Sequence, residues 1–320
     1  MIQGLLFNNI LIYFSIIIIG VVSLLLTQYV FLKYSILDKI NNRSSHKTVA
    51  TRSGGVSIFL SVLIVSFFCY LNDIDLFEYS LIVPLSLLLV VGLYDDVYKM
   101  DFKLKFIFQI IAAKIMIDNG FIIDNLHGVL WINEMNRVLA QLFTIFIIVA
   151  VINSINFIDG IDGLGLSVVL IFIGFFEFFS AEITPFINLS LLIFTTSIGL
   201  FYFNFKKNKK IFLGDSGSLL LGGVVSLYMI YILSQNYIIK PDYDIHKILF
   251  VLSILPFPII DMIRIVIRRI KNKKSPFEAD KNHLHHLILS KTKSHFKTTF
   301  LIILFNIIII FAFQIIQNFQ

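Results

Sequence analysis

Long uninterrupted apolar runs constrain this 320-residue chain more than any other feature of its sequence. The first of them reads "LLFNNILIYFSIIIIGVVSLLL", and about 20 apolar residues suffice to cross a bilayer core of ~30 Å. Hydrophobic residues make up 58% of the chain and charged residues 14%, against about 45–50% and about 25% in an average soluble domain. The sequence therefore predicts an all-α polytopic membrane protein. The strands of a β-barrel would instead alternate apolar and polar residues.

Ten spans are expected, within a single integral-membrane domain that covers residues 1–320. They are residues 5–32, 54–71, 80–94, 106–117, 138–152, 165–179, 188–203, 219–234, 248–267 and 299–317. The loops on one side of this arrangement carry 21 Lys and Arg residues, and the other side carries three. Basic loops favour the cytoplasm, so both chain ends are expected to face outward. No basic residue precedes Lys33, so the first run is interpreted as a retained span and not as a cleaved signal.

This topology gathers the acidic and histidine-containing motifs on the cytoplasmic side. They are "GLYDDVYKM", "NSINFIDGIDGLG", "FLGDSGS" and "DKNHLHH", and they lie far apart in the sequence. The simplest interpretation is one site, assembled from several loops at one membrane face.

The motif "NFIDGIDGLG" carries two carboxylates directly after an apolar run. Asp159 and Asp162 are three residues apart, so on a helical turn they would share a face, with Asn153 and Asn156 close to it. Such oxygen ligands suit Mg²⁺, which commonly binds one or two carboxylates plus substrate phosphates. The alternative is that these residues only form a turn and a helix cap. We favour the functional interpretation because acids at a membrane edge are costly.

Two further acidic motifs are open to similar interpretations. Asp95 and Asp96 repel each other and call for a metal or a proton between them, while Lys103 nearby suits a phosphate; a plain solvated loop is the alternative. In "FLGDSGS", the start of a helix offers an anion site, and a cation would mediate between Asp215 and a bound phosphate. A simple helix cap is the alternative for this acid.

The motif "DKNHLHH" contains three histidines: His283, His285 and His286. Zinc is disfavoured, because the spacing lacks an accompanying cysteine and the H-E-x-x-H pattern. Imidazoles can instead donate hydrogen bonds to phosphate or sugar oxygens, or carry a proton. In the first inner loop, Arg52 and its basic neighbours could face an anionic substrate or simply the lipid surface.

These four motifs, in this order, resemble those of the bacterial polyprenyl-phosphate N-acetylhexosamine-1-phosphate transferases. The resemblance runs from about Asp38 to His286, and Ile40 and Thr51 stand where the family usually has prolines. It implies transfer of a sugar-1-phosphate from a UDP-sugar to undecaprenyl phosphate, with release of UMP and with Mg²⁺, for which Mn²⁺ is an expected substitute. "HLHH" resembles the branch that uses UDP-N-acetylglucosamine to begin chains of O-antigen (a part of lipopolysaccharide), common antigen or teichoic acid.

The resemblance also implies roles for individual residues. Asp215 is expected to be the main Mg²⁺ ligand, with Asn156 as a second. Asp95 and Asp96 are expected near the lipid phosphate.

Further roles concern the sugar nucleotide. Asp159 and Asp162 are expected in the pocket for the diphosphate and nucleotide. The residues expected to bind substrate are Lys103, Asn153, His283, His285 and His286.

Several alternatives stay open at this stage. A phospho-MurNAc-pentapeptide transferase is one, although that branch carries three consecutive histidines where this chain has Leu284. A secondary transporter or lipid flippase is a rival from another class. Direct displacement and an aspartyl-phosphate intermediate are not separated. The expected partners are undecaprenyl phosphate, a UDP-N-acetylhexosamine and the lipids of the bacterial inner membrane, with no nucleic acid and with a homodimer as an option.

Overall fold

The computed structural model describes residues 10–38, 50–126, 131–180, 183–206, 208–234, 251–273 and 282–318. Its helices are α2 (Ile10–Lys33), α3 (Gly54–Leu71), α4 (Ile82–Tyr98), α5 (Phe102–Asp118), α6 (Arg137–Ile158), α7 (Leu164–Phe179), α8 (Ile187–Phe205), α9 (Gly214–Ser234), α11 (Pro256–Lys271), α12 (Leu284–Thr292) and α13 (His295–Asn318), with a 3-10 turn, η1 (Tyr79–Leu81), before α4. Seven helical segments in these ranges are long and apolar enough to cross a membrane, and α7 is a shorter apolar helix. The prediction of an all-α polytopic membrane protein is confirmed.

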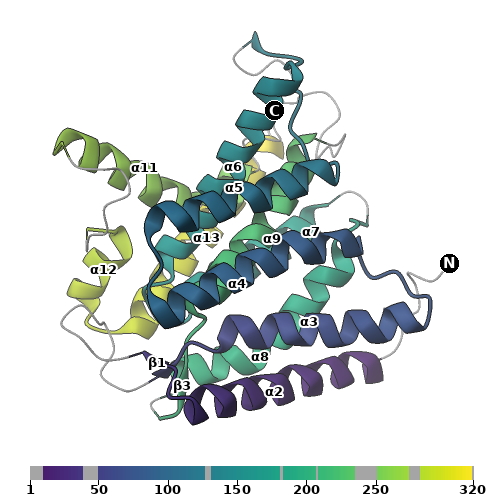
Figure 1. Cartoon of the computed structure of the whole chain (residues 1–320). Helices are drawn as coiled ribbons and strands as arrows, with labels where there is room; N and C mark the ends of the chain where they lie inside the picture. Colours follow the sequence, from purple (N-terminus) through teal and green to yellow (C-terminus); the bar gives the residue numbers. More distant parts are fainter. Residues whose placement is uncertain are drawn as a thin grey trace.

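Helix α9 forms the centre of the bundle (Figure 1). Most of its residues are buried, and it packs against α3, α4, α6 and α7. A Cβ atom on Gly55 of α3 would lie 2.1 Å from the backbone nitrogen of Gly217, and one on Gly92 of α4 would lie 2.4 Å from the carbonyl oxygen of Asp215. Only glycine allows such close approach between helices. These contacts therefore fix the first turn of α9 against α3 and α4.

A small sheet, which the sequence did not predict, lies near the start of α9. Strand β1 (Leu37–Asp38) pairs antiparallel with β2 (Ala50–Thr51), and β2 pairs parallel with β3 (Lys210–Ile211). Beyond β3, the carbonyl groups of Phe212 and Leu213 accept hydrogen bonds from the first two backbone N–H groups of α3. The sheet thus joins the chain before α3 to the chain before α9.

The expected span at 248–267 is not one continuous helix. Residues 251–254 are helical, the chain bends at Leu255, and α11 begins at Pro256, where proline fits the first helical turn. An exposed stripe of isoleucines and a basic last turn make α11 amphipathic; the stripe consists of Ile260, Ile263, Ile267 and Ile270. The prediction of one apolar span is therefore wrong from Leu255 onward, and residues 248–250 lie outside the described ranges.

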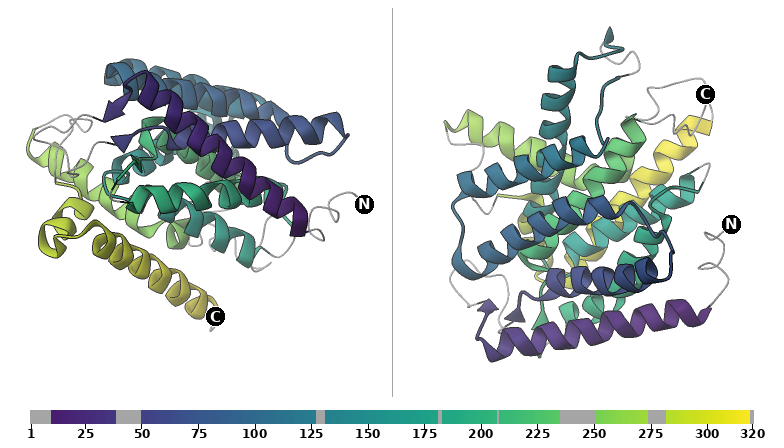
Figure 2. Two further views of the ribbon diagram at one scale, coloured as in Figure 1. Left: turned by 90° about the horizontal axis from the view of Figure 1, so that it is seen from below. Right: turned by 45° about the vertical axis from the view of Figure 1, so that its right-hand side comes forward.

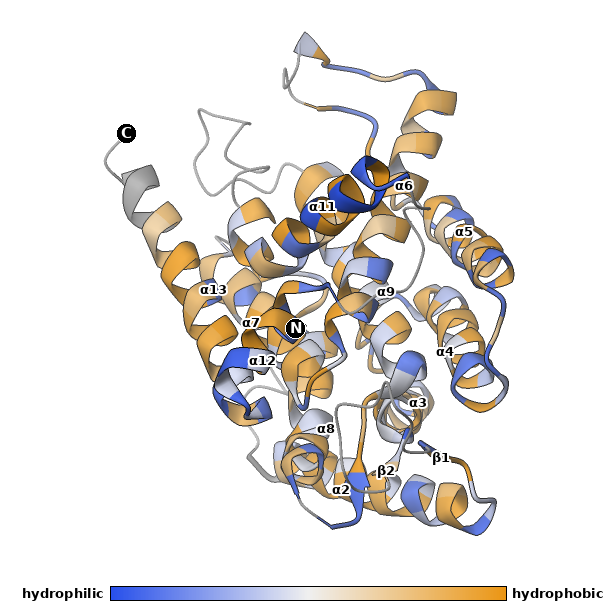
Figure 3. Cartoon of the chain, turned by 90° about the vertical axis from the view of Figure 1, so that its left-hand side faces the viewer, coloured by the Kyte–Doolittle hydropathy of each residue, from blue (hydrophilic) through white to orange (hydrophobic). Residues whose placement is uncertain are grey.

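The connections of α4 to α5 and α6 to α7, together with the start of α9, lie at one end of the bundle, on the left of Figure 1. The two views of Figure 2 place the beginning of α2 and the later turns of α13 toward the opposite end. We call the first of these the site end. Figure 3 looks toward it and shows hydrophobic residues along the outward faces of α2 and α13, with hydrophilic residues on α12. Large apolar side chains such as Phe14 and Phe300 are exposed on these faces, as lipid contact requires.

Candidate active site

A buried lysine joins the acidic motifs of α4 and α9. Lys105, in the first turns of α5, places its Nζ atom 2.9 Å from Oδ2 of Asp95 and 2.6 Å from Oδ2 of Asp215. The three side chains are only 10%, 15% and 28% exposed, so these charges interact with little screening. Of the lysines in this motif, the sequence singles out Lys103, an exposed residue two positions earlier, for substrate binding, and it does not predict the pairing of Lys105 with the two acids. The role of Lys103 stays a prediction.

Asp96 lies beside Asp95 but makes different contacts. Its carboxylate is fully buried and accepts hydrogen bonds from the backbone N–H groups of Asp215 and Ser216, each at 3.0 Å. Nη1 of Arg52 donates to the same carboxylate at 3.1 Å, and Nη2 of Arg52 pairs with Asp38 at 2.8 Å. A carboxylate at a helix N-terminus satisfies free N–H groups and complements the helix dipole. Asp96 therefore caps α9 and positions Asp215.

Asp159 and Asp162 lie in the same turn but make different contacts. Helix α6 ends at Ile158, and residues 159–163 form a turn before α7, so the expected helical turn carrying both acids is wrong. The Asp159 carboxylate makes no hydrogen bond or ion pair within the described part of the chain. Burial, and then the charges of Asp215 and Asp96, raise its pKa well above the ordinary value. Asp159 is thus an available oxygen ligand close to Asp215.

Asp162 is instead fully engaged by structural contacts. Its carboxylate pairs with Nζ of Lys210 in β3 and lies 3.1 Å from Nδ1 of His295, and its carbonyl accepts a hydrogen bond from Thr299 at 2.8 Å. Burial alone would raise the pKa of Asp162, but the hydrogen bonds from His295 and Lys210 outweigh burial and lower it. Asp162 therefore joins the α6–α7 turn to β3 and α13. This role of His295 could not be predicted from the sequence, where it is a lone histidine.

The two asparagines of α6 face different neighbours. Nδ2 of Asn156 donates to Oγ of Ser218 at 2.8 Å, which places Asn156 one turn of α9 from Asp215. Nδ2 of Asn153 donates to Oε1 of Gln109 and to its own helix, each at 2.7 Å, so it joins α6 to α5. Asn156 is therefore well placed for the predicted metal, and Asn153 lies one turn further from the site end.

The histidine cluster lies against the turn that follows Asp159. A Cβ atom on Gly160 would lie 3.0 Å from Nε2 of His285 and 3.4 Å from Cε1 of His286. His283 is buried, and its ring centroid lies 5.5 Å from those of both Phe157 and His285. The structure thus brings together two motifs more than 120 residues apart, as a single site requires.

His285 is fully buried, and neither of its ring nitrogens has a hydrogen-bond partner in the described part of the chain. Burial, followed by the proximity of His286 and His283, lowers the pKa of His285 to about 3, so its ring is neutral near pH 7. A buried imidazole with both nitrogens unpaired is costly, and a bound ligand would relieve that cost.

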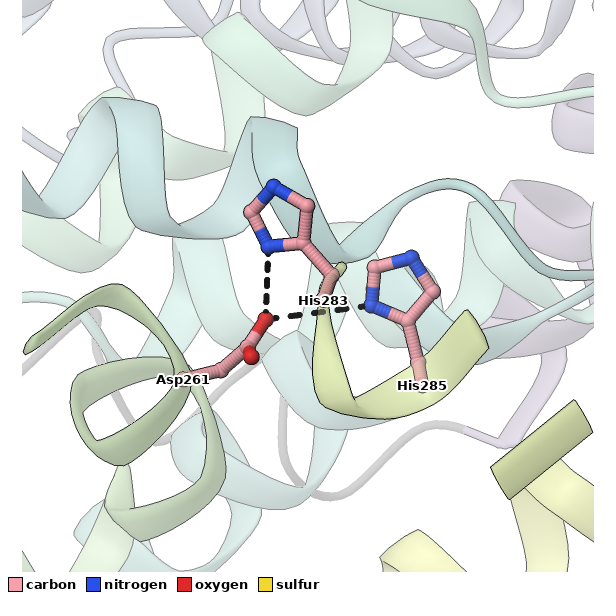
Figure 4. A group of neighbouring side chains, drawn as sticks. All are labelled: Asp261, His283 and His285. Carbon is pink, nitrogen blue, oxygen red and sulfur yellow. Dashed lines mark hydrogen bonds and ion pairs between the residues drawn. The ribbon is translucent and has the colours of Figure 1, made fainter. Parts of the chain in front are cut away.

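A further acid, Asp261 of α11, was missed in the sequence. Its side chain is 1% exposed and contacts His283, with Oδ2 2.8 Å from Nδ1 (Figure 4). The signal was present, because an acid inside a predicted span is expensive and commonly functional.

This arrangement suits binding of a phosphate-bearing molecule. Asp159 and Asp215 offer oxygen ligands, Lys105 offers a cation, and the neutral ring of His285 offers hydrogen bonds beside Gly160. Phosphates bound this way commonly share a divalent cation with the carboxylates.

Comparison with known proteins shows which family this chain resembles. Residues 78–233 match the model of glycosyl transferase family 4, a range that contains the motifs of Asp95, Asp159 and Asp215. The probable undecaprenyl-phosphate N-acetylglucosaminyl 1-phosphate transferase of Bacillus subtilis is 30% identical over 283 residues, covering 87% of this chain and 76% of that protein. The undecaprenyl-phosphate alpha-N-acetylglucosaminyl 1-phosphate transferase of Pasteurella multocida is 33% identical over 281 residues, covering 83% and 75%.

A relative with a different lipid in its name is the decaprenyl-phosphate N-acetylglucosaminephosphotransferase of Mycobacterium leprae, 27% identical over 299 residues, covering 84% of this chain and 74% of that protein. The relatives are thus named for transfer of the same sugar phosphate to polyprenyl phosphates. The chain belongs to glycosyl transferase family 4.

Proposed function

We propose that the protein transfers N-acetylglucosamine-1-phosphate from UDP-N-acetylglucosamine to undecaprenyl phosphate and releases UMP. This would be the first membrane step in the synthesis of a bacterial cell-envelope polysaccharide. The observation that carries the proposal is that the turn after Asp159 lies close to both Asp215 and the histidine cluster. The names of the relatives support the acceptor class and the transferred group.

The site end faces the cytoplasm in this proposal. The basic residues at the ends of α8 and α11 support that orientation, because Lys and Arg accumulate in cytoplasmic loops. A lipid phosphate held at the inner-membrane surface and a soluble nucleotide could then meet at the Asp159 turn. A transporter would place its binding groups nearer the bilayer midplane, and it would release no UMP.

The reaction joins two anions, so charge neutralisation and positioning dominate its barrier. An oxygen of the lipid phosphate bonds to the β-phosphorus of the donor, the bond from that phosphorus to the bridging oxygen breaks, and UMP leaves with this oxygen. The second pKa of a phosphate monoester is about 6, so the attacking phosphate is largely dianionic at neutral pH and needs little help from a base. Lys105 would offset charge, and Asp159 would bind a metal or orient the acceptor.

The residues present fit a magnesium ion. Asp215 and Asn156 would hold it, because both provide oxygen ligands and contacts through Ser218 place them near each other. When bound, Mg²⁺ would neutralise phosphate charge and stabilise the leaving group. Asp215→Asn should therefore keep the fold and lose at least ~10²-fold in activity. Near-normal turnover of this variant, or full activity in EDTA, would contradict the metal assignment; replacement of Mg²⁺ by Mn²⁺ is tested in the same assay.

The donor is tested with a panel of UDP-sugars, undecaprenyl phosphate and the purified protein. UDP-N-acetylglucosamine should give radiolabelled lipid and UMP, because "HLHH" resembles the branch that uses this donor and the relatives are named for the same sugar phosphate. Efficient transfer from UDP-MurNAc-pentapeptide, with none from any UDP-N-acetylhexosamine, would overturn the donor and leave the reaction class intact.

Two chemical routes remain for this transfer. A direct displacement inverts the configuration at the β-phosphorus, whereas an aspartyl-phosphate intermediate requires two displacements and retains it. Asp159 is our candidate for the carboxylate in such an intermediate, because it makes no hydrogen bond or ion pair within the described ranges. A donor with a chiral β-phosphorus separates the two routes.

A further inference from the structure

Both oxygens of the Asp261 carboxylate accept hydrogen bonds from the histidine motif. Oδ2 lies 2.8 Å from Nδ1 of His283, and Oδ1 accepts a hydrogen bond from the backbone N–H of Leu284 at 2.8 Å. Oδ2 also lies 3.9 Å from Nδ1 of His285 (Figure 4). Asp261 belongs to α11, whereas His283 is the residue that immediately precedes α12. One buried acid therefore joins these two segments.

Asp261, His283 and His285 could in principle form a metal site, since one possible ligand atom from each lies within 4.8 Å of the others. The distances favour a hydrogen bond instead. Two ligands of a tetrahedral Zn²⁺, each about 2.0–2.1 Å from the metal, lie about 3.3 Å apart. Oδ2 of Asp261 and Nδ1 of His283 are closer than that, at 2.8 Å. Arg264 also lies 3.5 Å from the same carboxylate and supplies a positive charge there.

The hydrogen bond determines which ring nitrogen of His283 carries a proton. A carboxylate only accepts, so Nδ1 of His283 must donate to Asp261. In the neutral ring, Nε2 is then an acceptor, and on protonation it becomes a donor. The ring plane is held as well, since Nδ1 is anchored at Asp261 and the ring lies beside Phe157. This is how a carboxylate orients a working imidazole in many enzymes.

We propose that Asp261 is a positioning residue that fixes the tautomer and orientation of His283 for contact with the donor's phosphates or sugar. The inference rests on the proposed function, in which the histidine cluster binds the UDP-sugar. The second oxygen of Asp261 caps α12 by accepting from the N–H of Leu284. Asp261 therefore also places His285, in the first turn of α12, against the turn of Gly160. Helix α11, and not the histidine motif alone, thereby sets the geometry of the cluster.

Asp261→Asn is the sharpest test, because it preserves shape and reverses polarity. The asparagine oxygen can still accept from the N–H of Leu284, but its NH₂ group would face Nδ1 of His283 and donate to it. His283 would then carry its proton on Nε2. The direct readout is ¹⁵N NMR of histidine-labelled protein, with the His283 signals identified by their loss in His283→Gln. Nδ1 should be protonated in the wild type and unprotonated in Asp261→Asn.

The kinetic readout follows from the same reversal. Asp261→Asn should lose roughly 10²-fold in kcat/KM while retaining its folded yield. If Asp261 acts through His283, the double variant Asp261→Asn/His283→Ala should be no less active than His283→Ala alone. Glu177→Gln is the matched control: it converts another carboxylate that bonds to side chains, Ser190 and Thr184, and it should leave kcat/KM unchanged.

The NMR, kinetic and zinc measurements test the role of Asp261, and the transfer assay tests the proposed function. An unprotonated Nδ1 in the wild type, or losses that multiply in the double variant, would overturn the positioning role. Stoichiometric zinc in the purified protein that disappears in Asp261→Asn would overturn it in favour of a metal site. Absence of transfer by the wild type would count against the proposed function alone, because the NMR measurement would still report on Asp261.

Discussion

Lys105 provides the most informative perturbation of the acidic site. In Lys105→Met the side chain keeps its apolar length and loses its charge, so Asp95 and Asp215 face each other without a cation between them. We expect a less stable protein, a loss of transfer activity, and a stronger response to magnesium. The stronger response to magnesium is the specific expectation, because a bound Mg²⁺ would restore the positive charge between the two acids that the substitution removed.

The structure supplies the magnitude of this effect. At an effective dielectric constant of about 20, unit charges 2.6–2.9 Å apart attract by about 6 kcal/mol. Desolvation of Lys105, which is 10% exposed, opposes much of this attraction. Removing one partner of a buried pair costs about 3–5 kcal/mol, because the remaining charge is left buried and uncompensated. For a domain of this size, at about 2 °C per kcal/mol, the expected fall in Tm is about 6–10 °C.

Thermal unfolding in detergent, with and without millimolar Mg²⁺, measures the effect. Mg²⁺ should raise the Tm of Lys105→Met by more than it raises that of the wild type. Lys103→Met is the matched control for stability, since Lys103 is exposed and two residues away, and its Tm should equal that of the wild type. Equal Tm values and equal magnesium responses for Lys105→Met and the wild type would refute this reasoning.

Two other substitutions should separate activity from stability. Asp159→Asn should lose at least ~10²-fold in activity and have a Tm equal to or above that of the wild type. Burial and the neighbouring acids raise the pKa of Asp159, so its charge is unfavourable to folding and its removal should not lower the Tm. A clearly lower Tm would contradict this. Asp162→Asn should lower the Tm at pH 7 by about 6 °C, since Lys210 is left unpaired. The pKa of Asp162 is lowered in the folded protein, so its stabilising contribution is present above an ordinary pKa of about 3.9 and disappears as pH falls through the folded value. A Tm difference that does not shrink below about pH 4 would exclude this explanation.

Much of the fold could be predicted from hydropathy alone. Apolar runs of span length have few alternatives to helices, because a backbone in lipid must satisfy its own hydrogen bonds. The failure at Leu255 has a local cause, since proline at position 256 starts a new helix and the following isoleucines and arginines alternate with helical spacing. The strands escaped prediction because two-residue strands carry no periodic pattern, and only tertiary contacts between distant loops define them.

The sequence identified the acids of the predicted cytoplasmic motifs and the three histidines, but it did not identify Asp261 or the contacts of Lys105. The acids were recognisable because a carboxylate at a membrane edge is costly, and the histidines because three of them lie within four residues. Sequence could not distinguish Asp96, which caps α9, from Asp159, whose carboxylate is unpaired in the described ranges, since both are acids close to the end of an apolar run. The pairing of Lys105 with Asp95 and Asp215 could not be predicted for a related reason: the side of α5 that faces the site depends on packing against α4 and α6.

The central claim is that this site transfers a sugar together with the phosphate that carries it. The most direct test uses UDP-N-acetylglucosamine labelled with ³²P at either the α- or the β-phosphorus, with undecaprenyl phosphate, Mg²⁺ and the purified protein. The β label should appear in the lipid product and the α label in UMP, and both products should be absent with EDTA. A lipid that carries the sugar without the β label, with UDP released, would contradict the claim, as would a wild-type protein that forms no labelled lipid from any UDP-sugar.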